Sequence, residues 1–282
     1  MVSPDAIPAP FQPSPLAAAV YIVGAGPGDP ELLTVKAQRL LSQADAVFYA
    51  NSLVPPQVLD WLRADADRIG TANLTLEDIL PMMIERVRAG QSVVRLQSGD
   101  PSLYSAIHEQ MQALAAAAIP FEVVPGISAY QAAAARLQVE LTVPGLVQSI
   151  ILTRISGRTA VPEGEELAAL AAHRTSLCLY LSARHVEAAQ AQLLEHYPAD
   201  TPVAVCFRLG WPDEQIWQVP LTEMAALTHR QNLVRTTLYL ISPALATGWG
   251  EGATAPRSRL YSPDHDHLFR PRSGVSGPAP QW

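Results

Sequence analysis

A glycine-rich turn near the start of the chain is the first segment whose residue types suggest ligand chemistry. Residues 20–29 read VYIVGAGPGD, an apolar run that leads into three alternating glycines and an acidic residue. Glycine allows positive φ angles and lets a ligand approach the backbone closely. A dinucleotide-binding turn would need Gly or Ala where Asp29 stands, and Pro27 lacks the N–H that a pyrophosphate would use. The Lys-Ser/Thr ending of a phosphate-binding loop is also missing, so the sequence predicts a ligand other than a polyphosphate.

Two further loops follow apolar runs in the same manner. Residues 98–104 read SGDPSLY and residues 125–129 read PGISA. Loops at the carboxyl ends of strands are where open α/β sheets bind ligands. Asp100 has two interpretations, the N-cap of the helix that follows or a residue that positions a cofactor. Ser128 is expected to cap the helix after the third loop, a role compatible with ligand contact.

Short apolar runs that alternate with amphipathic stretches must position these loops. Such alternation is typical of an α/β protein with a largely parallel sheet. The Trp211-Pro212-Asp213 turn predicts a hairpin and therefore some antiparallel pairing. Strands are predicted at 19–23, 46–49, 92–96, 121–124, 150–153, 177–181, 203–207, 215–219 and 238–241. Helices are predicted at 32–41, 76–87, 103–117, 128–136, 163–172 and 186–195.

The chain is expected to contain two domains between two tails. We place an N-terminal α/β domain at 18–142 and a C-terminal α/β domain at 143–245. Residues 1–17, rich in Pro and Ala, and residues 246–282, rich in Gly, Pro, Ser and Arg, are expected to be disordered. The cluster at 265–267 (His-Asp-His) has metal-ligand residue types but no rigid scaffold, so no metal site is predicted.

Composition narrows the class of protein. The 282 residues are 49% hydrophobic and 16% charged with a net charge of −7, which indicates a globular chain and argues against a nucleic-acid partner. Cys178 and Cys206 lie in apolar runs and are expected to be small buried hydrophobic residues of a reduced, cytoplasmic protein. The N-terminus does not resemble a signal peptide, and no apolar window is long enough to span a membrane, so no membrane partner is expected.

The three loops, in this order, resemble the tetrapyrrole methylase family, also called the cobalamin-precorrin methyltransferases. The matching motifs are GAGPGDPELLT at 24–34, VVRLQSGDPSLYS at 93–105 and VVPGISA at 123–129. The resemblance covers roughly residues 20–245. It implies two αβα domains with the active cleft between them, S-adenosylmethionine as methyl donor, a tetrapyrrole substrate and a homodimer.

Further segments resemble one subgroup of the family, which methylates precorrin-4 at ring carbon 11 in cobalamin biosynthesis. They lie at 49–54, 140–144, 151–154, 157–163 and 211–214. Methylases of the sirohaem precursor carry a proposed Asp base after the second strand, whereas this chain has Ala50-Asn51 there, which weakens that assignment. Four alternatives stay open: a cobalt-precorrin-4 methylase of the oxygen-independent route, another methylase of this fold, a non-catalytic nucleotide-binding module and a nicotinamide dehydrogenase.

Position by position, the resemblance implies two sets of site residues. Cofactor contacts are implied at Pro27, Ser98, Gly99, Asp100, Leu103, Ser128, Ala129, Leu181, Arg208, Leu209 and Thr237. Leu181 and Leu209 are equally open to interpretation as core residues. Candidates for the substrate and its carboxylates are Lys36, Arg95, Tyr104, Arg154 and Arg158, with Arg208 and Tyr49 as further possibilities. No catalytic base is assigned, because an electron-rich ring carbon needs mainly in-line positioning and exclusion of water.

Overall fold

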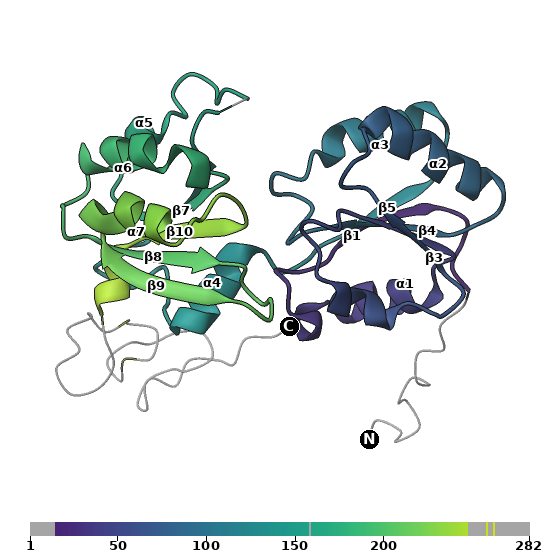
Figure 1. Cartoon of the computed structure of the whole chain (residues 1–282), viewed down its shortest axis with the longest axis horizontal. Coiled ribbons are helices and arrows are strands. Elements are labelled where there is room, and N and C mark those ends of the chain that lie inside the picture. The colour runs from purple at the N-terminus through teal and green to yellow at the C-terminus, as the bar shows by residue number, and fades with distance from the viewer. Residues whose placement is uncertain (1–14, 158, 248–257, 259–261, 263–282) are drawn as a thin grey trace, which may run out of the picture. The chain divides into compact units, whose positions relative to one another are not determined.

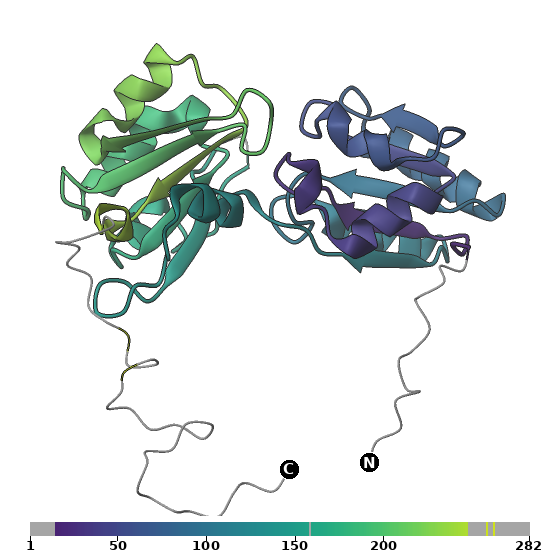
Figure 2. The same cartoon turned by 90° about the horizontal axis from the view of Figure 1, so that it is seen from below.

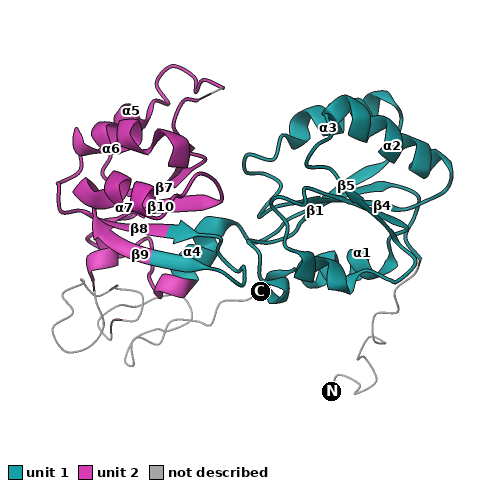
Figure 3. Cartoon of the chain, viewed as in Figure 1, with its two compact units in different colours: residues 1–135, 206–216 teal, residues 136–205, 217–282 magenta. Residues whose placement is uncertain are grey.

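The computed structural model describes residues 15–157, 159–247, 258 and 262 (Figure 1). Most of both predicted tails, the 265–267 cluster and Arg158 therefore lie outside the described residues. The chain forms two compact units, one of residues 1–135 and 206–216 and the other of residues 136–205 and 217–282 (Figure 3). Each unit is built around its own five-stranded sheet, so the predicted α/β fold with two sheets is confirmed.

The first unit contains a fully parallel sheet in the order β3-β2-β4-β1-β5. Its strands are β1 (Val20–Gly24), β2 (Ala46–Tyr49), β3 (Asp67–Gly70), β4 (Val93–Gln97) and β5 (Phe121–Val124). Its helices are η1 (Pro30–Leu32), α1 (Val35–Gln43), η2 (Pro56–Trp61), α2 (Leu76–Arg88) and α3 (Ile107–Ala116), and α4 (Ala129–Leu137) begins in this unit. Parallel strands require helical crossovers, which here cover both faces of the sheet.

Helices lie on both faces of the first sheet (Figures 1 and 2), and alternating side chains of the strands supply two separate cores. Tyr21 and Val23 pack with Leu40 and Leu41 of α1 on one face. On the other face, the neighbouring strand residues pack against α2 and α3, where Met83 is fully buried. Burial on alternate faces is what the strand period of two requires, and it leaves the strand ends free to carry ligand loops.

The second unit contains a mixed sheet in the order β6-β7-β10-β8-β9. Its strands are β6 (Ile150–Arg154), β7 (Ser176–Tyr180), β8 (Pro202–Phe207), β9 (Gln215–Pro220) and β10 (Thr237–Ile241). Its helices are α5 (Leu167–Ala171), η3 (Ala183–His185), α6 (Val186–Leu194), η4 (Leu221–Glu223), α7 (Met224–Arg230) and η5 (Pro243–Ala246). β6 pairs with β7 in parallel and β10 pairs with β7 antiparallel. β8 and β9 are neighbours, as expected for strands joined by the Trp211 turn.

Both cysteines are buried and free, as expected for small hydrophobic residues. Burial raises the pKa of the Cys206 thiol to about 12, so this sulfur stays protonated at neutral pH. Within the described residues, no helix has both the length and the apolar character that crossing a bilayer would require.

Two predicted helices are shorter in the structure than in the sequence pattern. The helix expected at 103–117 begins only at Ile107, because Ala106 adopts a left-handed conformation with φ 49° and the residues before it form turns. The helix expected at 163–172 is reduced to α5, Leu167–Ala171. The segment lost from the first helix is partly apolar but held in turns, and the segment lost from the second contains Gly164 with φ 85° in a turn, so periodicity alone does not set either boundary.

Candidate functional site

The loops that follow β1, β4 and β5 meet at one edge of the first sheet, because these three strands are parallel and adjacent. Backbone hydrogen bonds join the first two loops. The Gly99 N–H donates to the Gly26 carbonyl at 2.7 Å, and the Gly26 N–H donates to the Gly99 carbonyl at 3.2 Å. Residues 24–29, 98–105 and 125–128 therefore form one connected surface, which we call the loop platform.

Close contact between the loops of the platform requires glycine. A Cβ atom at Gly24 would lie 2.6 Å from Gly126 Cα and 2.7 Å from the Gly99 carbonyl oxygen. A Cβ atom at Gly126 would overlap the same carbonyl oxygen and lie 2.8 Å from Gly24 Cα. Such distances are shorter than van der Waals contact, so the strand ends can approach this closely only without side chains.

Asp100 holds the second and third loops together. Its Oδ1 accepts hydrogen bonds from the Ser102 N–H at 2.8 Å and from the Ser102 hydroxyl, and its Oδ2 accepts one from the Gly126 N–H at 2.8 Å. Burial alone would raise the pKa of Asp100, but these hydrogen bonds outweigh it and hold the pKa below its usual value. The N-cap interpretation of Asp100 is wrong, because α3 begins at Ile107 and its N-cap is Ala106.

The second loop keeps a strained backbone beside an open surface. Tyr104 has φ 55° and is 43% exposed, although positive φ is rare for residues other than glycine. A Cβ atom at Gly99 would lie 3.8 Å from Ser128 Cα, which is ordinary van der Waals contact, so the second and third loops approach each other here without overlap. Strained backbone on an exposed loop is often found at ligand sites.

The segment 208–214 forms a fourth side of the platform within the first unit. A Cβ atom at Gly28 would lie 2.5 Å from Trp211 Cδ1 and 2.7 Å from the Leu209 carbonyl oxygen. The Arg208 guanidinium stacks 3.9 Å from the centre of the Trp211 ring and pairs with Asp213 at 2.6 Å. The indole Nε1 of Trp211 is buried without a hydrogen-bond partner among the described residues. Residue patterns indicated only a turn here, and its contact with the first loop depends on tertiary structure.

The structure brings most candidate cofactor residues to the platform. Pro27, Ser98, Gly99, Asp100, Leu103 and Ser128 lie on it, Ala129 follows it, and Arg208 and Leu209 lie on the adjoining segment. Ser128 stands directly before α4, and its N–H donates to the Gln131 side chain at 2.9 Å. Leu181 and Thr237 belong to the second unit.

The structure decides between the ligand and core interpretations of the two leucines only in part. Leu181 is 67% exposed with φ 52°, so its core interpretation is wrong. Leu209 is buried, with 4% of its surface exposed. Its buried side chain leaves its carbonyl, which faces Gly28, as the group that meets the first loop.

The candidate substrate residues have different surroundings. Lys36 forms an ion pair with Glu122 on the neighbouring edge strand. Arg95 is buried and donates to the Thr71 hydroxyl at 3.0 Å. Arg154, in the second unit, donates to the carbonyls of Thr159 and Ala160 at 2.7 and 3.2 Å. Tyr104 lies on the platform and Arg158 lies outside the described residues.

Asn51, which stands where some relatives carry a proposed base, has a structural role. Its Oδ1 accepts a hydrogen bond from the Ala72 N–H at 3.1 Å and lies close to Gly70, so it links the ends of β2 and β3. A neutral amide in this bond does not take up a proton at neutral pH.

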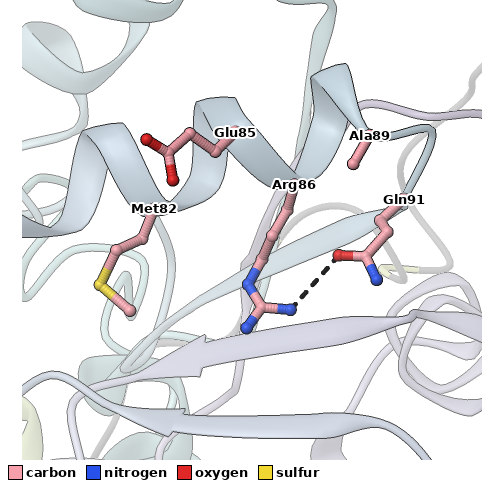
Figure 4. A pocket seen from close by; sticks show the side chains of 5 residues that line it. All are labelled: Met82, Glu85, Arg86, Ala89 and Gln91. Atoms are coloured by element: carbon pink, nitrogen blue, oxygen red, sulfur yellow. Dashed lines mark hydrogen bonds between the residues drawn. The ribbon is translucent and has the colours of Figure 1, made fainter.

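A separate pocket lies at the opposite edge of the first sheet. It is lined by Met82, Glu85, Arg86, Ala89 and Gln91, and Arg86 donates to the Gln91 side chain at 3.3 Å (Figure 4). The pocket adjoins the turn that leads into the amino end of β4, whereas the platform is formed at the carboxyl ends. It therefore belongs to a different face from the candidate site.

The fold and the platform are those of an α/β protein that carries glycine-rich loops at the carboxyl ends of its parallel strands. The family model of the Tetrapyrrole (Corrin/Porphyrin) Methylases matches residues 19–225. The chain belongs to this family.

Two curated relatives are similar over most of their length. One is the precorrin-4 C(11)-methyltransferase of Pseudomonas aeruginosa, 45% identical over 252 residues that cover 89% of this chain and 98% of the relative. Another is the cobalt-precorrin-4 C(11)-methyltransferase of Methanocaldococcus jannaschii, 38% identical over 89% of this chain and 95% of the relative.

The chain is also similar to solved structures of methyltransferases. A cobalt precorrin-4 methyltransferase is 40% identical with a TM-score of 0.78, and the match covers 81% of this chain and 96% of that one. The uroporphyrin-III C-methyltransferase of Thermus thermophilus, solved with S-adenosylhomocysteine, is 27% identical with a TM-score of 0.68, over 80% of this chain and 98% of that one.

Proposed function

We propose that this chain transfers the methyl group of S-adenosylmethionine to ring carbon 11 of precorrin-4 in cobalamin biosynthesis. The observation that carries the proposal is the loop platform, on which three motifs widely separated in the sequence are joined by hydrogen bonds. Family membership and the similarity to precorrin-4 methyltransferases support the same substrate.

The residues of the platform suit S-adenosylmethionine. The platform carries no side chain at Gly99 and is bordered there by Ser128, so a nucleoside and its thioether chain are proposed to lie against main-chain groups. The residues proposed to hold it are those of the platform and the 208–214 segment, with Leu181 and Thr237 from the second unit. When bound, this cofactor supplies an electrophilic methyl group on a sulfonium sulfur.

The proposed reaction requires the protein to position the two reactants more than to transfer a proton. Both oxygens of Asp100 accept hydrogen bonds from the chain, so this carboxylate holds the loops and is not assigned as a base. A nucleophilic ring carbon must be kept in line with the methyl group, and an oriented pair of reactants gains a large rate advantage without an acid or base. Closure of the site against water would protect the reactive donor.

The substrate carboxylates call for cationic or hydroxyl partners. Tyr104 is exposed on the platform, and Arg154 and Arg158 are the candidates from the second unit. Lys36 is available only if its ion pair with Glu122 opens. A homodimer in the cytoplasm completes the proposal. Light scattering of the purified protein tests the dimer.

The test is methyl transfer itself. The purified protein is incubated with S-adenosylmethionine labelled with ¹³C in its methyl group and with enzymatically prepared precorrin-4. A new methyl signal at ring carbon 11 is expected by NMR, and the Gly126→Ala variant, with its platform disrupted, should give a weaker signal at the same subsaturating cofactor concentration. A methyl group at another ring position would assign the chain to a different reaction of the family.

A second candidate substrate is cobalt-precorrin-4. It is favoured by the similarity to the M. jannaschii relative and to the solved cobalt precorrin-4 enzyme. A parallel incubation with the cobalt complex separates the two, because the better substrate is the one with the higher kcat/KM.

A further inference from the structure

Arg95 is a buried cation beside the loop platform. It lies on β4 in register with Ile22 of β1 and Phe48 of β2, on the face that packs against α2 and α3. Only 8% of the residue is exposed. Its guanidinium reaches past β2 to the hydroxyl of Thr71, which directly follows β3. The side chain therefore extends from β4 over β2 toward the end of β3, on the side of β4 away from β1 and β5, while β4 itself leads into the second loop of the platform.

No acidic group compensates this charge within the described part of the chain. Arg95 donates a hydrogen bond to the Thr71 hydroxyl, and its Nε is buried without a partner among the described residues. Burial lowers the pKa of Arg95 to about 10, so the guanidinium remains charged at neutral pH. A buried charge without an opposite charge is strongly unfavourable, and a ligand of opposite charge would compensate it.

A second unpartnered donor lies on the same strand face. Gln97, two residues after Arg95, is 8% exposed, and its Nε2 has no hydrogen-bond partner among the described residues. Its carbonyl accepts the Ala25 N–H at 2.7 Å, so Gln97 adjoins the first loop of the platform. Gln110 of α3 leaves its Oε1 without a partner on the facing side, but this neutral oxygen cannot balance a positive charge.

We propose that Arg95 and Gln97, with Arg95 oriented by Thr71, bind a carboxylate group of a ligand seated on the loop platform. A planar guanidinium matches a carboxylate in bidentate geometry, and a neighbouring amide N–H supplies a further donor. A phosphate suits the site less well, because Asp29 and Asp100 bring negative charge to the adjoining loops.

The identity of the ligand rests on the proposed function, which offers two sources of this carboxylate. One is the amino-acid end of S-adenosylmethionine, and the other is an acetate or propionate arm of the tetrapyrrole. The recognition chemistry is the same for both, so binding experiments on the full-length chain have to separate them.

The test compares wild type with Arg95→Met and Gln97→Leu by isothermal titration. The probes are S-adenosylhomocysteine, 5′-methylthioadenosine, which lacks the amino-acid carboxylate, and uroporphyrin III, a tetrapyrrole polycarboxylate. If the site holds the cofactor carboxylate, Arg95→Met lowers the affinity for S-adenosylhomocysteine at least tenfold and leaves the affinity for 5′-methylthioadenosine within twofold of wild type. If the site holds a tetrapyrrole arm, Arg95→Met lowers the affinity for uroporphyrin III at least tenfold and leaves the affinities for the other two probes within twofold. Gln97→Leu should lower the affinity for the same probe by a smaller factor.

Arg88→Met, on the exposed end of α2, is the matched control and should leave every affinity unchanged. The Tm of Arg95→Met should equal or exceed that of wild type, because the variant removes an uncompensated buried charge. Affinities within twofold of wild type for all probes would overturn the proposal, as would a lower Tm without a change in affinity. If wild type binds none of the probes, the proposed function fails. Sodium acetate then tests the carboxylate site by itself, because it should raise the Tm of wild type but not that of Arg95→Met.

Discussion

At the scale of single residues, the loop platform depends on positions where a side chain is absent. Gly24 and Gly126 allow three strand ends to approach within contacts that a Cβ atom would prevent. Gly99 is different, because a Cβ atom there would make only ordinary van der Waals contact with Ser128, while its φ of 69° lies in the region that favours glycine. The first two glycines therefore serve packing between the loops, and the third serves the backbone conformation of the second loop.

Gly126→Ala should separate the second and third loops. The added methyl group overlaps the Gly99 carbonyl oxygen, and such overpacking costs about 1–3 kcal/mol of unfolding free energy. We expect the Kd for S-adenosylhomocysteine to rise at least tenfold, measured by isothermal titration. Gly90→Ala is the control, since a Cβ atom there meets nothing within 4 Å and lies far from the platform. Unchanged cofactor affinity in Gly126→Ala would show that the packing of this glycine does not shape the site.

Asp100→Asn should make the platform less stable at neutral pH. An amide NH₂ would then face the Gly126 N–H, and the loss of a charge-assisted hydrogen bond costs about 1–2 kcal/mol. The pKa of Asp100 is lowered in the folded protein, so its contribution is present above the unfolded value of 3.8 and is lost as the pH falls through the folded pKa.

Urea unfolding from pH 7 to pH 3 measures this dependence. The stability difference between wild type and Asp100→Asn should be largest at pH 7 and should shrink below about pH 3.8. Asp60→Asn, an exposed residue outside the platform, should show no such difference. A gap between wild type and Asp100→Asn that stayed constant over this pH range would contradict the role assigned to the carboxylate.

At the scale of elements, the site combines loops from one sheet with a segment between two strands of the other. β8 and β9 belong to the second sheet, yet residues 206–216 cluster with the first unit. Gly28 and Gly210 mark the contact, since a Cβ atom at either would collide with the opposite segment. The 208–214 segment therefore restricts the first loop.

Gly28→Ala tests whether this contact matters for the site. The new methyl group would meet the Trp211 ring at 2.5 Å, and φ 155° is unfavourable for alanine, so we expect a loss of about 2–4 kcal/mol from clash and strain together. Gly164→Ala has a positive φ of 85° in open space and should lose only the strain, about 1 kcal/mol. Denaturant unfolding measures both. Equal losses in the two variants would mean that the Trp211 contact is not rigid.

At the scale of the whole molecule, ligand binding and stability are linked. A ligand that binds only the folded state stabilises it by about 2.7 kcal/mol at a concentration of one hundred times its Kd. S-adenosylhomocysteine should therefore raise the Tm in thermal denaturation, whereas NAD⁺ should not, because Asp29 and Pro27 remove the features of a dinucleotide turn. A comparable rise with NAD⁺ would favour the dehydrogenase alternative.

Local patterns in the sequence determined most of the elements. The predicted bounds of β2 and β5 agree with the structure, and those of the other predicted strands differ by one residue at one end or at both. Apolar runs bounded by Gly and Pro carry this information because each strand buries its side chains locally. β3 was missed because its first residues, Asp67 and Arg68, are exposed at an edge. α7 was missed because seven residues give too short a periodic signal.

Tertiary structure alone decided the partners of the site residues. Asp100 was identified as a candidate from its motif, but its bond to Gly126 joins residues 26 positions apart. Arg95 meets Thr71 across β2, and Leu181 is exposed while Leu209 is buried. These outcomes depend on the strand order β3-β2-β4-β1-β5 and on how the 208–214 segment packs. Periodicity reports which face of an element is apolar, whereas the neighbour across that face is set by contacts between residues far apart in the chain.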